Sequence, residues 1–267
     1  MTVSGSAIKI EARNILKNNY STAFVTTVTV LAVWYIFNYL CSILEIFTTA
    51  VLADILLVVL CVVLFAPLLL GYLRYLWRMS SGVTDNSITI FYYFSYPKLY
   101  FKCLSLIITL SLRIGLCYLI FLLPYFVLQV ITGTWIYETL DITVPLWTLS
   151  FSNIITVLHY VATVATVFSC LKYYLAPIIF VADEKIDTAE AIHMSKVISK
   201  KTMLDFIFLC FSILGWAVLS ILVLPLIYTL PYMFLAYLKH CSYAVEDFNN
   251  DISKINYDDI PTFVAGA

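Results

Sequence analysis

The stretch Leu171–Lys196, LKYYLAPIIFVADEKIDTAEAIHMSK, decides the fold of this chain. It begins with apolar residues typical of a membrane-embedded helix, reaches Pro177 and turns polar at Asp183. A second helix is predicted to begin near Asp187, because an aspartate followed three residues later by Glu190 satisfies free N–H groups at a helix start. We interpret the stretch as the place where the chain leaves a bilayer and re-forms a charged helix.

The composition of the whole chain supports a membrane setting. Of its 267 residues, 63% are hydrophobic and only 12% are charged, and the mean hydropathy is +0.97. Soluble domains are about 45–50% apolar and about 25% charged. A soluble core cannot hide this much apolar surface, so lipid is expected to be the solvent for most of it. The net charge of −1 gives no electrostatic reason to bind nucleic acid.

The apolar runs predict an all-α, polytopic membrane bundle of about six transmembrane helices. A helix needs about 20 apolar residues to cross a bilayer, and the domain from 20 to 246 has runs of that order. An amphipathic interfacial helix is expected at 1–19, short cytoplasmic helices between spans, and a polar cytoplasmic tail at 247–267, expected to be poorly ordered or loosely docked. The predicted spans are 22–44, 55–78, 103–131, 150–181, 204–221 and 223–244.

The last two spans allow a second interpretation. Residues 205–243 form either two short helices that turn near 220–224, or one span followed by an interfacial helix. The third and fourth spans are too long to stand upright, so they are expected to tilt, to bend at Pro124 and Pro177, or to extend into water.

The N-terminal segment 6–19 has the period of an amphipathic helix. One face is apolar and consists of Ile8, Ala12, Ile15 and Leu16. A stripe of cations lies beside it and consists of Lys9, Arg13 and Lys17. Such a helix suits the headgroup layer, with its cations near anionic lipid. The alternative is a short cytosolic helix packed on the ends of the spans.

The distribution of Lys and Arg predicts the orientation of the chain. Neither occurs between residues 18 and 73 or between 114 and 171, and the predicted outer segments carry only acids, namely Glu45, Asp54, Glu138 and Asp141. Because Lys and Arg accumulate in cytoplasmic loops, we expect both termini in the cytoplasm.

Three polar residues inside the predicted spans are candidate ligand-facing groups. Arg113 lies near the middle of the third span, where an unpaired cation is costly and faces a bundle interior or a watery cavity. It either lines a functional cavity or pairs with carbonyl groups. Lys172 can reach the cytoplasmic surface with its flexible side chain. His159 is interpreted mainly as a hydrogen-bonded packing residue, with a proton relay as the alternative.

Two cytoplasmic loops resemble each other. Ala66-Pro67 and Ala176-Pro177 are each followed by a polar exit and a helix-start signal, at Asp85-Asn86-Ser87 in one case and at Asp187–Glu190 in the other. A parallel internal repeat is one interpretation of this similarity.

No motif for catalysis, metal or cofactor is present. The sequence lacks HExxH, GxSxG, GxGxxG and a phosphate loop. The seven cysteines form no CxxC pair and do not cluster with the three histidines, so we expect small packing residues. We therefore expect no enzyme and no cofactor, with an unrecognised lipid-modifying enzyme as the minor alternative.

Three blocks of sequence resemble the bacterial polytopic membrane family known as domain of unknown function 975. They are Ala12–Lys17 with Tyr20; Pro67-Leu68 with Gly71 and Arg74; and Tyr173, Ala176-Pro177, Asp183, Ala191-Ile192, Ser195-Lys196, Ser212, Gly215-Trp216 and Pro231-Tyr232. Ala66 replaces the usual glycine of the second block, Cys210 stands where an aspartate is common, and the expected glycine-rich turn between the last spans is missing. The resemblance implies a multi-helical protein of the bacterial inner membrane, and it does not specify an activity.

Two classes of function follow as expectations. The first is a non-enzymatic membrane interaction or organising protein, or a subunit of a complex, with the bilayer, anionic lipid and other membrane proteins as partners. The alternative is a transporter for a small anionic or lipidic solute. Interrupted spans and Arg113 favour transport, whereas the scarcity of intramembrane acids disfavours ion coupling.

Overall fold

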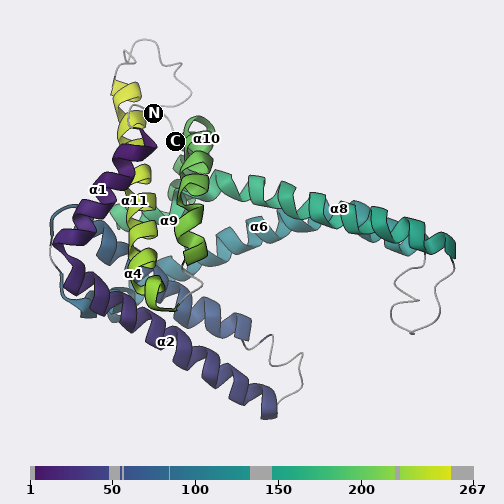
Figure 1. Cartoon of the computed structure of the whole chain (residues 1–267), viewed down its shortest axis with the longest axis horizontal. Coiled ribbons are helices and arrows are strands. Elements are labelled where there is room, and N and C mark those ends of the chain that lie inside the picture. Colours follow the sequence, from purple (N-terminus) through teal and green to yellow (C-terminus); the bar gives the residue numbers. More distant parts are fainter. Residues whose placement is uncertain are drawn as a thin grey trace. The chain divides into compact units, whose positions relative to one another are not determined.

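The computed structural model describes residues 4–47, 55, 57–83, 85–132, 146–219 and 223–253, and every regular element in these ranges is a helix (Figure 1). Five stretches within them are long and apolar enough to cross a membrane: Tyr20–Leu40, Leu57–Ser80, Pro97–Val130, Ile154–Ala182 and Thr188–Val218. The all-α prediction is confirmed, and the chain has the helices of a multi-pass membrane protein.

The chain divides into two compact units. Unit 1 combines residues 1–107 with residues 175–267, and unit 2 comprises residues 108–174. Each unit is described by itself below.

Helix α1, Gly5–Asn18, is the predicted amphipathic helix. Ser4 caps it, since its side chain accepts a hydrogen bond from the Ala7 N–H. Ile8, Ala12 and Leu16 are buried, and the helix packs mainly on α11, Val223–Ser253. The apolar face therefore has a protein partner, as in the packing alternative. Contact of α1 with lipid headgroups stays a prediction.

Helix α2, Tyr20–Phe47, follows α1 directly. Two later helices begin at proline after an irregular turn. Helix α4, Ala66–Ser80, follows the π-helical η1, Cys61–Phe65. Helix α9, Ala176–Ala182, comes shortly after the 3₁₀ turn η3, Leu171–Tyr173. Pro67 and Pro177 both lie in the first turn of their helix, where the missing N–H is not needed. This local likeness agrees with the sequence, and the internal repeat stays a prediction.

A short irregular segment connects α4 to the next long helix. Asn86 caps the 3₁₀ turn η2, Ser87–Phe91, by accepting a hydrogen bond from the Ser87 N–H. Helix α5, Tyr92–Ser95, follows, and α6 runs from Pro97 to Thr132 with Pro124 inside it. Unit 2 contains the part of α6 from Ile108 onwards, together with α8, Leu146–Cys170, and η3.

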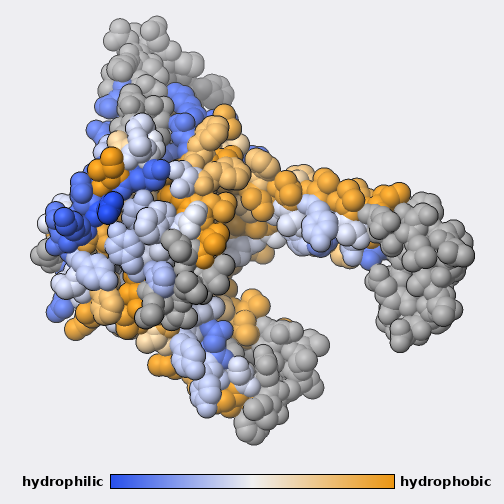
Figure 2. Space-filling view, in the orientation of Figure 1, coloured by the Kyte–Doolittle hydropathy of each residue, from blue (hydrophilic) through white to orange (hydrophobic). Residues whose placement is uncertain are grey.

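Helix α10, Thr188–Leu219, begins where the sequence predicted a helix start, directly after Asp187. The predicted charged helix and the predicted span from 204 are, however, one continuous helix, because no Gly or Pro interrupts residues 188–214. Ala191 and Ile198 are buried, Met194 and Lys196 are half-buried, and Lys200 and Lys201 are exposed. On the visible surface, hydrophobic residues gather over α10 and hydrophilic residues over α1 (Figure 2).

Helix α11 is the central helix of unit 1. It packs against α1, α10, α4 and α2, and no residue from Pro225 to Val245 is exposed. It is not among the five apolar stretches, since Lys239, His240 and several tyrosines lower its hydropathy. A helix surrounded by other helices needs less apolar surface than one that faces lipid. Helix α11 also continues to Ser253, into the predicted tail, and residues 254–267 lie outside the described residues.

Candidate functional site

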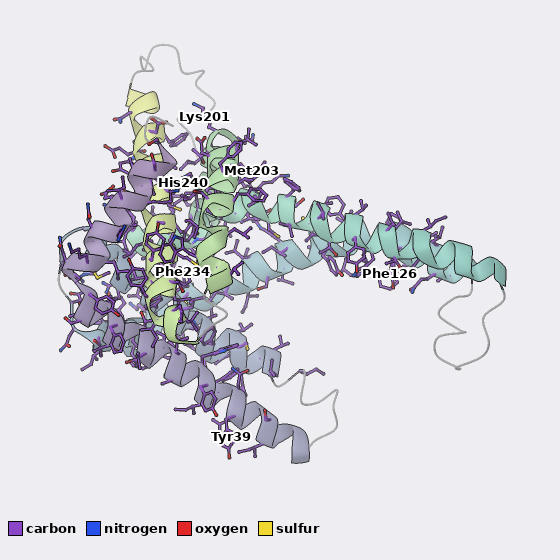
Figure 3. The ribbon with its side chains drawn as sticks, in the orientation of Figure 1. Tyr39, Phe126, Lys201, Met203, Phe234 and His240 are labelled. Atoms are coloured by element: carbon purple, nitrogen blue, oxygen red, sulfur yellow. The ribbon has the colours of Figure 1, made fainter. Side chains whose placement is uncertain are left out.

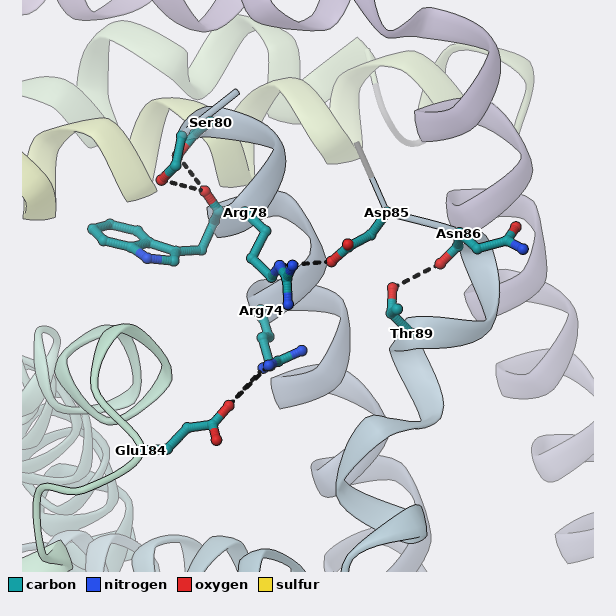
Figure 4. Close-up of polar contacts among 9 residues, drawn as sticks. Arg74, Arg78, Ser80, Asp85, Asn86, Thr89 and Glu184 are labelled. Carbon is teal, nitrogen blue, oxygen red and sulfur yellow. Dashed lines mark hydrogen bonds and ion pairs between the residues drawn. The ribbon is translucent and has the colours of Figure 1, made fainter. Parts of the chain in front are cut away.

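Arg74 carries a buried charge on α4. Its residue exposure is 8%, and its Nε and Nη2 atoms lie 3.0 and 2.9 Å from Oε1 of Glu184. The guanidinium carbon lies 3.5 Å from the centre of the Tyr92 ring, and the Tyr92 hydroxyl donates to Oε2 of Glu184 at 2.9 Å. The ion pair and the cation–π contact together satisfy the buried charge. The cluster joins α4, α5 and the loop after α9, and Figure 4 shows its ion pair between Arg74 and Glu184.

The packing of η2 against α4 supports this cluster. Gly71 lies one turn before Arg74, and a Cβ atom at residue 71 would lie 1.9 Å from the carbonyl oxygen of Ile90. Only glycine allows the backbone of η2 to approach α4 this closely. One turn further along α4, Arg78 pairs with Asp85 at 2.7 Å just before η2. The spacing of Gly71, Arg74 and Arg78 thus positions η2 and α5 along a single face of α4.

The loop between α9 and α10 is held in place by Glu184 and its neighbours. Oδ1 of Asp183 accepts a hydrogen bond from the Lys185 N–H at 2.9 Å, a local turn typical of aspartate. Lys102 of α6 donates to the Glu184 carbonyl oxygen at 3.4 Å. Backbone and side chain of Glu184 are therefore both fixed within unit 1, and this orders the whole loop.

A groove of about 430 Å³ lies beside this loop, between α4, α9, α10 and α11. Its apolar lining comes from all four helices and the loop, and its rim carries two carboxylates and two amides. The apolar side chains are Trp77, Ile178, Ile179, Ile186, Met194 and Val245, and the polar rim is Asp183, Glu246, Asn249 and Asn250. None of the described residues that line the groove is a Lys or Arg. The groove therefore suits an apolar ligand that carries positive charge.

Two tyrosines of α5 have different environments. Burial, and the hydrogen bond that its hydroxyl donates to Glu184, raise the pKa of Tyr92. Burial likewise raises the pKa of Tyr93, so both remain neutral phenols. The Tyr93 ring stacks on Phe180 with 6.1 Å between centroids. Its hydroxyl is buried and has no hydrogen-bond partner among the described residues.

The three candidate residues from the sequence all lie in unit 2. His159 of α8 packs its ring 5.3 Å from that of Tyr125, and its Nδ1 is buried without a hydrogen-bond partner in the described residues. Arg113 is half-buried on α6, and Lys172 is exposed on η3. Tyr125 also accepts a hydrogen bond from Gln129. The structure thus joins His159 to Tyr125, while a ligand-facing role for Arg113, Lys172 and His159 stays a prediction.

The sequence did not single out Arg74 and Glu184 as a pair. Arg74 stands out only as part of a family block, and Glu184 is one of several acids in a charged loop. A usable signal was the spacing of Pro67, Gly71 and Arg74, which repeats at i, i+4 and i+7 and therefore places them on one face of a helix.

Comparison with known proteins gives a family. Residues 1–242 match the family described as "Protein of unknown function (DUF975)". The chain belongs to the DUF975 family. The resemblance inferred from the three sequence blocks is thereby confirmed, and the Gly71 and Arg74 block of this DUF975 protein corresponds to the packing of η2 and the buried ion pair. No curated protein and no solved structure matched the sequence.

Proposed function

We propose that this DUF975 protein is a non-enzymatic membrane interaction or organising protein that acts as a subunit of a complex. The observation that carries the proposal is the groove with its apolar lining and a rim containing Asp183 and Glu246. Its occupant is a basic amphipathic helix of another membrane protein. Such helices place apolar anchors in a groove at i, i+3 or i+4, and i+7, and their Lys or Arg residues would then meet the two carboxylates.

The proposed setting is a bacterial inner membrane with six crossings and both termini in the cytoplasm. The asymmetry of Lys and Arg supports the orientation. Helix α11 serves as the sixth crossing, shielded from lipid by α1, α2, α4 and α10. On this topology the groove opens toward the cytoplasm, since Asp183 follows the predicted fourth span.

The bilayer is the second proposed partner. Arg13 and Lys17 are exposed on α1 and are free to meet anionic headgroups, which attract basic helices. Nucleic acid is not a proposed partner, because the net charge is −1 and these cations do not form a phosphate track.

A photo-crosslinking amino acid in place of Ile186 tests the groove in intact membranes. A protein adduct is expected at this position, whereas the same amino acid in place of Phe208, which is 70% exposed on α10, should capture lipid. The adduct at 186 should map to a basic segment of the partner. It should disappear when Asp183→Lys and Glu246→Lys reverse the rim charge.

The control for charge reversal is Glu190→Lys, because Glu190 is exposed and does not line the groove. This control should leave the adduct intact. An adduct at 186 that survives reversal of the rim charge, or that maps to an acidic segment, would contradict the proposal.

Transport of a small anionic or lipidic solute is the second candidate function. The helix interruptions at η1 and η3, each close to a proline, favour it, because broken helices are common at transporter binding sites. Purified protein in proteoliposomes would then carry solute flux that Arg113→Met reduces. Absence of flux together with a charge-dependent adduct at 186 favours the interaction protein.

A further inference from the structure

A second cavity, of about 500 Å³, lies where α1, α10 and α11 meet within unit 1. Lys9 lines it from α1, and Asp205, Phe208 and Ser212 line it from α10. His240, which is 1% exposed, contributes from α11, and Figure 3 shows it in the region where the three helices converge. This cavity is separate from the groove proposed above and shares none of its lining residues.

One lysine, one aspartate and one histidine line the cavity, namely Lys9, Asp205 and His240. The Lys9 ammonium group donates a hydrogen bond to the Ser212 hydroxyl, and among the described residues no carboxylate lies within ion-pair distance of it. Asp205 and Ser212 are seven residues apart and therefore share one face of α10. The acid and the Lys9 cation thus face the same space from two different helices.

Exposed apolar side chains of α10 adjoin this cavity. Asp205 is the last charged residue of the helix, since residues 206–219 contain none. Leu204 and Phe208 are 65% and 70% exposed, and Figure 2 shows hydrophobic residues over α10. A ligand with a polar head and apolar chains can therefore place its head in the cavity and its chains along Phe208.

We propose that this cavity binds the phosphoethanolamine headgroup of a phospholipid. Lys9 and the Ser212 hydroxyl bind the phosphate, because an ammonium group is a strong hydrogen-bond donor to phosphate oxygens. Asp205 accepts hydrogen bonds from the primary ammonium group, which carries three donors. The cavity volume lies within the range typical of small-molecule sites.

The same chemistry explains which headgroups are excluded. A headgroup with phosphate and glycerol only brings no cation to Asp205. A choline headgroup brings a cation without N–H donors, so it cannot hydrogen-bond to the carboxylate. The presence of both Lys9 and Asp205 therefore selects a zwitterion with a primary amine.

The test uses the full chain in phosphatidylcholine nanodiscs and measures bound lipid by native mass spectrometry. Phosphatidylethanolamine should bind in preference to phosphatidylglycerol and to the phosphatidylcholine background. Asp205→Asn should lower the preference for phosphatidylethanolamine about tenfold and leave phosphatidylglycerol binding unchanged or stronger. Lys9→Met should weaken binding of both lipids about tenfold.

The matched control is Lys17→Met, since Lys17 is an exposed cation on the same helix and does not line the cavity. It should leave the preference intact. If Lys9→Met does not fold, Lys9→Gln keeps a hydrogen-bond donor for Ser212 without the charge. Equal lipid preference in the parent, Asp205→Asn and the Lys9 variant would overturn the proposal.

Free phosphoethanolamine separates the two sources of this headgroup. If the lipid is the ligand, the free compound should not displace bound phosphatidylethanolamine at equal concentration, because it lacks the acyl chains that lie along Phe208. Displacement at equal concentration would assign the cavity to a soluble zwitterion and overturn the lipid assignment. Either result leaves the groove and its partner to be judged by the crosslink at 186.

Discussion

Gly71 of α4 lies against the backbone of Ile90, so closely that a Cβ atom at residue 71 would lie 1.9 Å from the Ile90 carbonyl oxygen and 2.9 Å from its carbonyl carbon. The obstacle is main chain, which cannot rotate away as a side chain can. Ile90 is fully buried. Residue 71 therefore fixes the distance between α4 and η2, and through it the position of Tyr92.

Gly71→Ala is expected to separate η2 from α4. Overpacking of this kind costs about 1–3 kcal/mol, so the thermal unfolding midpoint in detergent should fall. Hydrogen exchange should increase at residues 86–93. The matched control is Gly115→Ala, because a Cβ there meets nothing within 4 Å and alanine favours helix. A midpoint for Gly71→Ala equal to that of the parent would contradict the close approach.

The Arg74–Glu184 pair should be asymmetric in its effect on stability. Side-chain exposure is 10% for Arg74 and 34% for Glu184. Glu184→Ala leaves a buried cation whose remaining partner among the described residues is Tyr92, and this is expected to cost about 3 kcal/mol. Arg74→Met leaves a carboxylate that water can reach, and it should cost less. The double variant should regain part of the loss.

The comparison for this experiment is the Arg78–Asp85 pair. Its arginine side chain is 39% exposed, so Asp85→Ala leaves a cation that water can solvate. The expected cost is below about 1 kcal/mol. Unfolding midpoints of the three single variants and the double variant provide the measurement. An effect of Glu184→Ala no larger than that of Asp85→Ala would argue against the buried pair.

Local features of the fold could be predicted from the sequence, because they depend on neighbouring residues. The period of Ile8, Ala12 and Leu16 predicted α1 and its buried face, and Asp187 marked the start of α10. The helix starts at Ala66 and Ala176 were not predicted, although a bend at Pro177 was one expectation for the fourth span. The length of α10 was not predicted, since the charged residues near 200 suggested a boundary while the backbone propensity continued unbroken.

The polar contacts of unit 1 could not be predicted, because they join residues far apart in the chain. Glu184 is 110 residues from Arg74, and composition alone does not distinguish it from Asp183 or Asp187. Hydropathy drew attention to Arg113 because it stands alone in an apolar run. Arg74 lies near the end of a predicted span, where a cation is expected at the surface, and its burial depends on η2 and α5 folding over it.

Tyr93→Phe should leave stability unchanged or raise it. The Tyr93 hydroxyl is buried without a hydrogen-bond partner among the described residues, and removing such a group relieves a desolvation cost of about 1–3 kcal/mol. The control is Tyr72→Phe. The Tyr72 hydroxyl lies 2.9 Å from that of Thr27, whose proton is directed to the Ala23 carbonyl oxygen.

Tyr72→Phe removes the hydrogen bond that the Tyr72 hydroxyl donates to the buried Thr27 hydroxyl. The free energy of unfolding should therefore fall by about 1 kcal/mol. The two tyrosine variants should thus change the unfolding midpoint in opposite directions or, at the least, by clearly different amounts. A loss for Tyr93→Phe as large as that for Tyr72→Phe would mean that the Tyr93 hydroxyl has a partner, such as a bound water molecule.

Docking of α1 should weaken in acid because of Glu11. Its Oε1 lies 2.7 Å from Lys239 Nζ, and its Oε2 accepts a hydrogen bond from the Tyr243 hydroxyl at 2.6 Å. Burial alone would raise the pKa of Glu11. This effect is outweighed by the hydrogen bonds from Lys239 and Tyr243 and by the Lys239 charge, so the pKa lies below the usual 4.5. A carboxyl group whose pKa is lowered by folding stabilises the folded state above its unfolded pKa, and this contribution is lost as the pH falls through the folded pKa.

Hydrogen exchange of the α1 amides, corrected for intrinsic rates, measures this docking. Protection should be constant from pH 7 to pH 5 and should fall below about 4.5, where Glu11 begins to bind a proton. In Glu11→Gln, the protection of the α1 amides at pH 7 should fall by about 1 kcal/mol or less, because the pair is partly exposed. This variant should also lose most of the pH dependence of protection. Lys17→Met, which removes an exposed charge of α1 without touching the pair, should behave as the parent. If Glu11→Gln keeps the full acid response, another group holds α1 on α11.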